Sequence, residues 1–335
     1  MAHKPLLCHQ HVHRSRTTIN NLITSYYHTI PEPEPQILPL LSCTGFQHIT
    51  LIKQCRIDPA LGECTITLED VALHLRIRVD GRVMLLREVP PENAHKGATP
   101  KLTWLLSILR TPLPKEPTTH KLQCRCRAYI MYMINNVLIP DKSGNRVHLI
   151  YLNLLRDLNN IKKYSWGSAC LANLYKELWR ASSKVGKVMG GCVILLQSWA
   201  WYRIPFIALR VIRPETTYPL AKRLEYSVTP HDDLVRYRSR IYHMESHEFS
   251  WVLYRGFEEH LSRQAYRDID IWYACTAIIC FLIVEWHQTN WVKLQFGLQQ
   301  DIPIDPMNLD RFHQIDMRGN HYSDGMEYHA EWINI

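Results

Sequence analysis

Two apolar runs constrain the fold of this chain more than any other feature. Ile271–Val284 (IWYACTAIICFLIV) carries no charged residue, and Val188–Trp201 is similar, with Gln197 inside it. A membrane-spanning helix needs roughly 20 apolar residues, and both runs are shorter than that. We therefore predict that each run forms a helix buried in a protein core, and that the chain has no membrane partner.

The composition is that of a folded globular protein. Of the 335 residues, 46% are hydrophobic and 21% are charged, which excludes a disordered chain. The formal net charge is +8 with His neutral. Such an excess favours contact with anions, such as nucleic acids or phosphoproteins.

The N-terminal region has the composition of a tail. Residues 1–36 are rich in His, Thr and Pro and end in IPEPEPQ, and alternating Pro and Glu favour an extended linker. We predict a disordered tail over residues 1–36 and one folded domain over residues 37–335. The first residues lack the apolar core of a signal peptide, so we expect the ten cysteines to be buried, reduced thiols of a cytosolic or nuclear protein.

Helical periodicity dominates the rest of the chain. Thr67 and Asp70 match the capping-box pattern that begins a helix. In WGSACLANLYKELWRAS, apolar residues share one face, and we expect Lys176, Glu177 and Arg180 on the opposite, polar face. Apolar spacing predicts further helices at 104–109, 121–138, 147–158 and 192–203, of which the second is ended by Pro140 and the last by Pro205.

Strand signals are few. Asp80-Gly81 separates two short β-prone runs and predicts a small hairpin near residues 76–86. Residues 213–247 are polar and basic, and we interpret them as irregular. Because strands and helices do not alternate, a doubly wound sheet or a barrel is excluded. The predicted fold is mainly α, a multi-helix globular domain with at most that hairpin.

The turn Asp141–Asn145 (DKSGN) raises the question of a phosphate-binding loop. Such a loop needs a longer glycine-rich arc after a buried strand, whereas this turn has one glycine and follows a predicted helix. We interpret it as a connection between two helices.

Three clusters resemble metal ligands, and none has the spacing of a known site. Cys124 and Cys126 lack a second pair at matching spacing. The HMESH stretch places Glu outside the HExxH register of zinc proteases, so we interpret it as a solvated surface. The third cluster lies in the predicted tail and consists of Cys8, His9, His11 and His13. We predict no metal site and no cofactor.

Basic and aromatic residues alternate in one stretch, Arg236-Tyr237-Arg238-Ser239-Arg240. Arg can neutralise phosphates and Tyr can stack on a base, so direct nucleic-acid contact is an alternative function. The simpler interpretation is a charged loop balanced by Asp232 and Asp233. For Trp166, Trp199, Trp201 and Trp286 we expect core packing rather than a ligand site.

Several long stretches, rich in Trp and Gly, occur in the order of one family. They span about residues 62–333 and read GECTITLEDVALHL, VDGR, CRAYI, PDKSGNRVHLIYLNLLRDL, YSWGSACLANLYKELWRAS, GGCVILLQSWAWYRIPF, IICFLIVEWH, QFGLQQDIP and YHAEWI. On these motifs the sequence resembles the plant mobile domain family, also described as aminotransferase-like. Compared with that family, the N-terminal third is shortened.

The resemblance implies a helical domain found in flowering plants, in transposons and in host proteins. One branch, which resembles the MAINTENANCE OF MERISTEMS proteins, implies a nuclear protein that acts in transposon silencing, gene expression and meristem development. It also implies a protein partner similar to protein phosphatase seven. The family has no established catalytic residues. We expect its motif residues to be structural; they are Thr67, Asp70, Gly81, Gly144, Trp166, Gly167, Gly191, Trp199, Trp201, Trp286, Phe296 and Gly297.

The family description invites a test for pyridoxal phosphate chemistry, which needs a Schiff-base lysine and a phosphate cradle. Lys142 lies in a turn, and Lys184 and Lys187 flank glycines in a polar loop. We therefore expect a non-enzymatic interaction module. An enzyme with an unrecognised active site and a transposon-derived nucleic-acid-binding protein are the alternatives.

Overall fold

The structure is a computed structural model, and it describes ten parts of the chain. They are residues 31–47, 49, 66–67, 70–71, 102–140, 147–181, 189–207, 234–255, 269–281 and 283–302. The predicted hairpin near residues 76–86, the turn at 141–145 and residues 1–30 of the predicted tail lie outside these parts.

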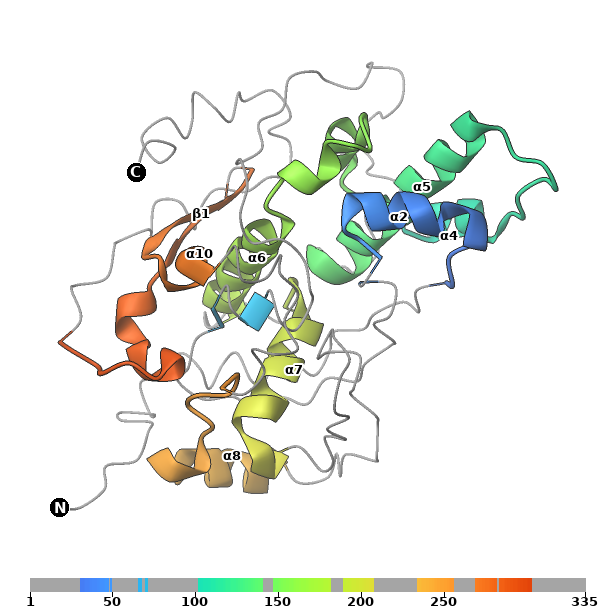
Figure 1. The fold of residues 1–335 in the computed structure, drawn as a ribbon. Helices are drawn as coiled ribbons and strands as arrows, with labels where there is room; N and C mark the ends of the chain where they lie inside the picture. Colours follow the sequence, from blue (N-terminus) through green and yellow to red (C-terminus); the bar gives the residue numbers. More distant parts are fainter. Residues whose placement is uncertain are drawn as a thin grey trace.

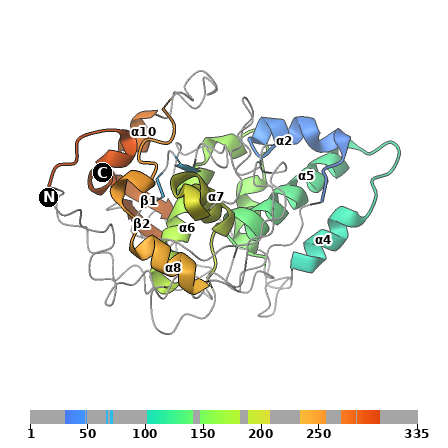
Figure 2. The same ribbon diagram turned by 90° about the horizontal axis from the view of Figure 1, so that it is seen from below.

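Helices form most of the described structure, as predicted, and a single two-stranded sheet accompanies them. Two helices occupy the centre, α6 (Trp166–Ala181) and α7 (Val193–Arg203). On one side, α2 (Leu38–Thr44), α4 (Leu102–Arg110) and α5 (Thr119–Met133) form a lobe; on the other lie α10 (Ile269–Tyr273) and the sheet (Figures 1 and 2). The fifteen-residue α5 continues into a π-helical turn, η4 (Ile134–Leu138), just before Pro140.

Short 3-10 helices connect these elements. They are η1 (Pro35–Ile37), η5 (Leu149–Leu155), η6 (Ile161–Lys163), η7 (Pro205–Ile207), η9 (Ser246–Glu248), η11 (Thr289–Trp291) and η12 (Lys293–Phe296). The predicted helix at 147–158 is therefore a 3-10 helix over much of its length, although Tyr151 and Leu154 are buried as its apolar stripe requires.

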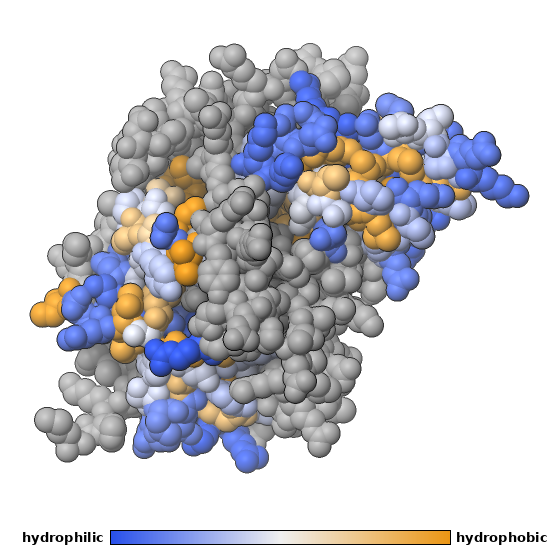
Figure 3. Space-filling view, in the orientation of Figure 1, coloured by the Kyte–Doolittle hydropathy of each residue, from blue (hydrophilic) through white to orange (hydrophobic). Residues whose placement is uncertain are grey.

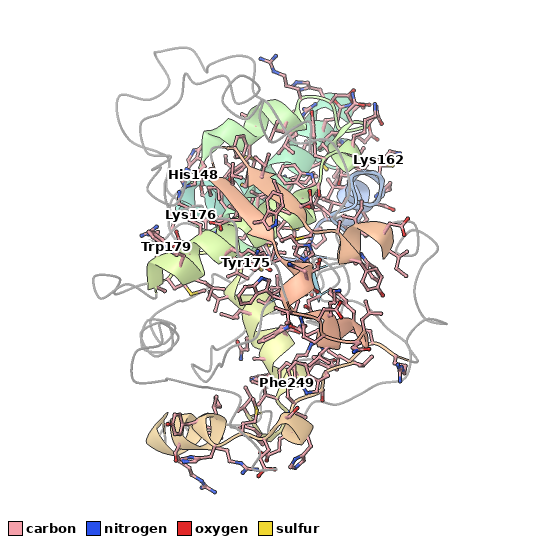
Figure 4. The ribbon with its side chains drawn as sticks, turned by 90° about the vertical axis from the view of Figure 1, so that its left-hand side faces the viewer. His148, Lys162, Tyr175, Lys176, Trp179 and Phe249 are labelled. Atoms are coloured by element: carbon pink, nitrogen blue, oxygen red, sulfur yellow. The ribbon has the colours of Figure 1, made fainter. Side chains whose placement is uncertain are left out.

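The core is built around α7, in which every residue is buried, including Gln197 and Ser198. Trp199 packs on Phe249 with ring centroids 6.3 Å apart, and Figure 4 shows Phe249 between α7 and α8 (Leu234–Tyr242). The prediction of a buried helix in this apolar run is confirmed. Arg203, the last residue of α7, is fully buried as well, so this charge needs an internal partner.

The prediction for the other apolar run is wrong. Only its first residues belong to a helix, α10, and the rest forms a hairpin of β1 (Thr276–Cys280) and β2 (Ile283–His287). The strands are antiparallel, with Ile279 opposite Val284. Periodicity alone cannot separate a short apolar helix from a buried strand, and here the β-branched residues favour the hairpin. Phe281, at the turn, has a positive φ.

Two further expectations need correction. Lys176 and Glu177 are buried on α6 instead of facing solvent. The hairpin packs against this helix, and the loop before α7 contacts Glu177 through Gly190. Residues 234–242, which we expected to be irregular, form helix α8. The reason is an apolar stripe: Ile241 and Met244 are buried on one face of this basic segment.

No helix in the described parts of the chain is long and apolar enough to cross a membrane.

Gly191 lies where two segments meet closely. Its φ is +81°, and a Cβ there would lie 3.2 Å from the Leu174 Cα. Its amide also donates to the Pro140 carbonyl at 3.1 Å. The left-handed conformation is costly for any residue with a Cβ, and the backbone of α6 cannot move aside easily.

We expect Gly191→Ala to lower the free energy of unfolding by about 2–4 kcal/mol, from backbone strain plus overpacking. Gly45→Ala is the matched control, because Gly45 has the same φ of +81° but nothing within 4 Å of its Cβ position. It should cost only about 1 kcal/mol. Equal losses in urea denaturation of the two variants would contradict the close contact with α6.

Candidate functional site

The chemically richest cluster in the described structure surrounds Asp70, which is fully buried. Its Oδ2 accepts hydrogen bonds from the Thr67 amide and hydroxyl, both at 2.7 Å, and the Asp70 amide donates to Thr67 Oγ1 at 3.2 Å. These reciprocal bonds confirm the capping box. The other oxygen, Oδ1, accepts from Arg203 Nη2 at 3.1 Å and from the Tyr254 hydroxyl.

Arg203 connects this carboxylate to a third segment. Its Nη1 donates to the carbonyls of Ser250, at 3.1 Å, and Trp251. The guanidinium also lies over the Tyr254 ring, 5.3 Å from the centroid, which is a cation–π geometry. The end of α7 is thereby joined to residues 67–70 and to residues 250–254. We call Thr67, Asp70, Arg203 and Tyr254 the Asp70 centre.

His287, on β2, lies near this centre. Burial lowers its pKa to about 4, against the smaller opposing effects of the Ala274 carbonyl and the Asp70 charge. Its Nδ1 is 3.0 Å from the Ala274 carbonyl oxygen, so the neutral tautomer that donates from Nδ1 fits this contact. The imidazole is therefore uncharged at neutral pH.

The residue types of this centre also occur in active sites, but its geometry is that of an internal support. Asp70 and Arg203 are both fully buried, and the bonds described above go to internal groups. A substrate would have to displace these bonds to reach either residue. Among the residues that the structure describes, no group of three His, Cys, Asp or Glu side chains is placed to hold a metal ion.

A second polar cluster joins α6 to the loop before α7. Glu177 accepts from the Gly190 amide at 3.0 Å and from Arg180 Nη1 at 2.6 Å. Lys176 is buried beside it and was missed by the sequence analysis, because its neighbours in the sequence suggested a solvated face. Figure 4 shows Lys176 and Tyr175 on α6, and the hairpin that contacts this helix. Lys142, Lys184 and Lys187 lie outside the described residues.

The described cysteines are free thiols, and they divide into two sets. Burial raises the pKa of Cys126 to about 12, and it raises that of Cys280 to about 12 despite the nearby Lys176 ammonium. The buried set is Cys126, Cys170, Cys192 and Cys280, as expected, whereas Cys43, Cys124 and Cys275 are exposed. Cys8 and the His residues near it lie outside the described parts.

The structure places the residues suggested for nucleic-acid contact on α8. Arg236 and Arg240 are exposed and Tyr237 is partly buried; Arg238 belongs to the same helix. The HMESH stretch follows directly and is at the surface, as expected, apart from the buried Met244. Glu245 of this stretch forms a capping box at η9 with Glu248, the residue after the stretch.

Most of the family-motif residues that the structure describes serve packing or chain direction. Trp166 donates to the Ile161 carbonyl at 3.1 Å and meets the Phe46 ring edge-on at 5.4 Å. Gly167, Trp199 and Trp201 are buried, whereas Trp286 is only partly buried and donates to Cys275 Sγ at 3.3 Å. Phe296 packs on Tyr273, and Gly297 has a φ of +72° that ends η12. Gly81 and Gly144 lie outside the described residues.

Comparison with known proteins agrees with these motifs. The profile of the family described as "Plant mobile domain" matches residues 60–335, which is most of the chain. The chain belongs to the plant mobile domain family.

Three relatives from Arabidopsis thaliana are similar over most of this chain. The serine/threonine-protein phosphatase 7 long form homolog is 34% identical over 82% of this chain and 23% of its own length. Protein MAIN-LIKE 2 is 28% identical over 82% of this chain and 45% of its own. Protein MAINTENANCE OF MERISTEMS is 29% identical over 76% of this chain and 57% of its own length. The chain thus spans between about a quarter and somewhat more than half of the length of each of these relatives. No solved structure matches it.

The Asp70–Arg203 pair should be essential to stability. We expect Asp70→Asn to lower the free energy of unfolding by about 3–5 kcal/mol, because it leaves the Arg203 charge buried without its counter-charge. Asp301→Asn is the control: it breaks the more exposed pair that Asp301 makes with Lys293 at 2.5 Å and should cost less than about 1 kcal/mol. The test is chemical denaturation with a double-mutant cycle that adds Arg203→Met. Additive losses in the cycle would show that the two residues do not interact.

His287 should make stability depend on pH. Its folded-state pKa of about 4 lies below the ordinary 6.5, so the unfolded chain binds a proton first as pH falls. The free energy of unfolding should therefore fall by on the order of 3 kcal/mol between pH 7 and pH 4. The His287→Asn variant cannot bind this proton, so its stability should fall less over that range. Parallel pH profiles for the two proteins would contradict a buried neutral imidazole.

Proposed function

We propose that this plant mobile domain is a non-enzymatic protein-interaction module of the nucleus, which acts in transposon silencing, gene expression and meristem development. The name of its relative MAINTENANCE OF MERISTEMS supports the developmental part of the proposal. The buried polar groups support the non-enzymatic part, because Asp70, Arg203 and Glu177 hold segments of the fold together and interaction surfaces are the better candidates for function. The nuclear location and the roles in silencing and gene expression rest on the family resemblance.

One apolar surface carries this proposal. Six large apolar side chains are exposed on the segment after β2 and on the two segments that contact it; they are Val252, Tyr273, Trp291, Leu294, Leu298 and Ile302. We call this set the C-terminal apolar surface. Figure 3 shows apolar atoms exposed at the left-hand edge of the molecule, over this segment. Exposed apolar clusters of this kind mark sites of protein contact.

The backbone beneath this surface is held in place by internal bonds. The Lys293 amide donates to Gln300 Oε1 at 3.0 Å, and Gln300 Nε2 donates to the Asn290 carbonyl at 2.8 Å. The Thr289 hydroxyl donates to the Tyr273 carbonyl at 2.8 Å. A surface that is already ordered loses little conformational entropy on binding. Trp and Tyr are also the residues most enriched at binding hot spots.

The partner that we propose is a protein similar to protein phosphatase seven. This identity rests on the family resemblance, and a phosphatase 7 long form homolog among the relatives supports it. In that role the domain contributes no catalytic group, and it positions the partner by contact alone.

The test is affinity purification of the tagged protein from plant nuclei, read by mass spectrometry for a phosphatase of this class. The double variant Trp291→Ser/Leu298→Ser should recover at least tenfold less of the partner than the wild-type protein does. A loss of about 1.4 kcal/mol of contact energy is enough to lower the affinity tenfold. Trp104→Ser is the matched control, because Trp104 is 49% exposed against 46% for Trp291 but lies on α4, in the opposite lobe (Figure 1).

Unchanged recovery with the double variant would contradict the role of this surface. Equal loss with the Trp104 variant would indicate a general loss of folding or solubility instead of a specific contact. Absence of the wild-type protein from the nuclear fraction would contradict the proposed localisation.

A further inference from the structure

Arg255 borders the C-terminal apolar surface and is exposed. Its Nη2 and a methyl group of Val252 each lie 3.4 Å from the Cβ position of Gly297. Gly297 ends η12, and its amide donates to the Leu294 carbonyl at 3.1 Å. The guanidinium therefore lies beside the turn that carries Leu294 and Leu298, two of the exposed apolar residues of this surface.

The charge of Arg255 is not compensated in the part of the chain that the structure describes, where its side chain makes no ion pair and no hydrogen bond. Lys293, on the same surface, differs in this respect, because it pairs with Asp301 at 2.5 Å. Asp270, on α10, is exposed as well, but it forms no ion pair with Arg255. Since a guanidinium stays protonated in proteins, the surface presents a permanent cation among apolar side chains.

A carboxylate is the group that fits this cation best. The planar fork of an arginine binds the two oxygens of a carboxylate at once. Proteins that recognise phosphorylated segments use clusters of arginines, whereas the nearest cation in the sequence of η12, Lys293, is already neutralised by Asp301. Asp270 also adds a negative charge to this side of the molecule. We therefore expect selection for one acidic residue beside Arg255, and not for a segment that is acidic throughout.

The apolar surroundings should strengthen such a pair. Contacts that exclude water from the centre of an interface raise the contribution of the residues they enclose. The Gly297 main chain already lies beside the guanidinium, and apolar side chains of a partner that pack on Leu294 and Leu298 would cover it further. An ion pair enclosed in this way contributes more to specificity than one exposed to solvent.

We infer that the C-terminal apolar surface binds a protein segment in which apolar residues flank an aspartate or glutamate, and that Arg255 holds this carboxylate. The inference rests on the proposed function, because it gives the chemistry of a partner for the same surface.

The test begins with a library of random peptides displayed on phage, which is selected on the full chain after counter-selection on the variant Trp291→Ser/Leu298→Ser. The retained peptides should carry Asp or Glu among apolar residues. Fluorescence anisotropy of one such labelled peptide should show about tenfold weaker binding to Arg255→Gln, because a hydrogen-bonded charge is lost. The same peptide with Lys in place of its acidic residue should prefer Arg255→Glu to the wild-type chain.

Arg110→Glu is the matched control, because Arg110 is also exposed but ends α4, in the opposite lobe (Figure 1). It should leave the affinity unchanged, and an equal loss would overturn the inference in favour of attraction by the net charge. Thermal denaturation of each variant checks that it is folded.

Two further outcomes separate this inference from the proposed function. Peptides that require Trp291 and Leu298, yet bind Arg255→Gln and Arg255→Glu as tightly as the wild-type chain, would overturn the inference and leave the surface in place. A selection that yields no peptide dependent on Trp291 and Leu298 would contradict the surface itself, and the inference with it.

Discussion

The buried pair of Asp70 and Arg203 is the interaction on which the rest of the structure depends. The two residues are 133 positions apart, and their bonds join the 67–71 segment, the end of α7 and the main chain at 250–251. A buried ion pair contributes little net stability compared with well-packed apolar residues, yet loss of one partner is severe. The pair therefore selects one arrangement of these three segments, because any other arrangement would leave a charge buried alone.

Other N-terminal segments are attached to the helical core in the same manner, by a side chain that reaches a distant carbonyl. The Tyr175 hydroxyl donates to the Ile66 carbonyl and the Tyr129 hydroxyl donates to that of Pro31. Arg125 contacts Glu34 at 3.5 Å and the carbonyl of Ile108 at 2.6 Å. These bonds occupy the polar ends of residues whose apolar parts already belong to the core. In the part of the chain that the structure describes, these interior polar groups hold separate segments of the fold together.

Much of the helical framework could be predicted from the sequence, and the failures have physical reasons. The helices α6 and α7 and the capping box at Thr67 depend on local patterns, and each was found where the pattern placed it. The hairpin was missed because an apolar run of fourteen residues fits a strand pair as well as a helix. The partner of Asp70 could not be found at all from local spacing. A charge at the end of a mostly apolar helix was the available signal, since Arg203 must meet an opposite charge if it is buried.

The C-terminal apolar surface depends on the segment that Arg203 holds. The chain leaves α8, passes through η9 and reaches Ser250 and Trp251, whose carbonyls bind Arg203. The next residue, Val252, belongs to the C-terminal apolar surface and lies 3.4 Å from the Cβ position of Gly297. A change at the Asp70 centre would therefore disturb this surface as well as the core, whereas changes at Arg255 or Trp291 affect the surface alone. Loss of function caused by variants of the centre cannot, for this reason, show that the centre itself contacts a partner. Only the surface variants can separate partner contact from folding.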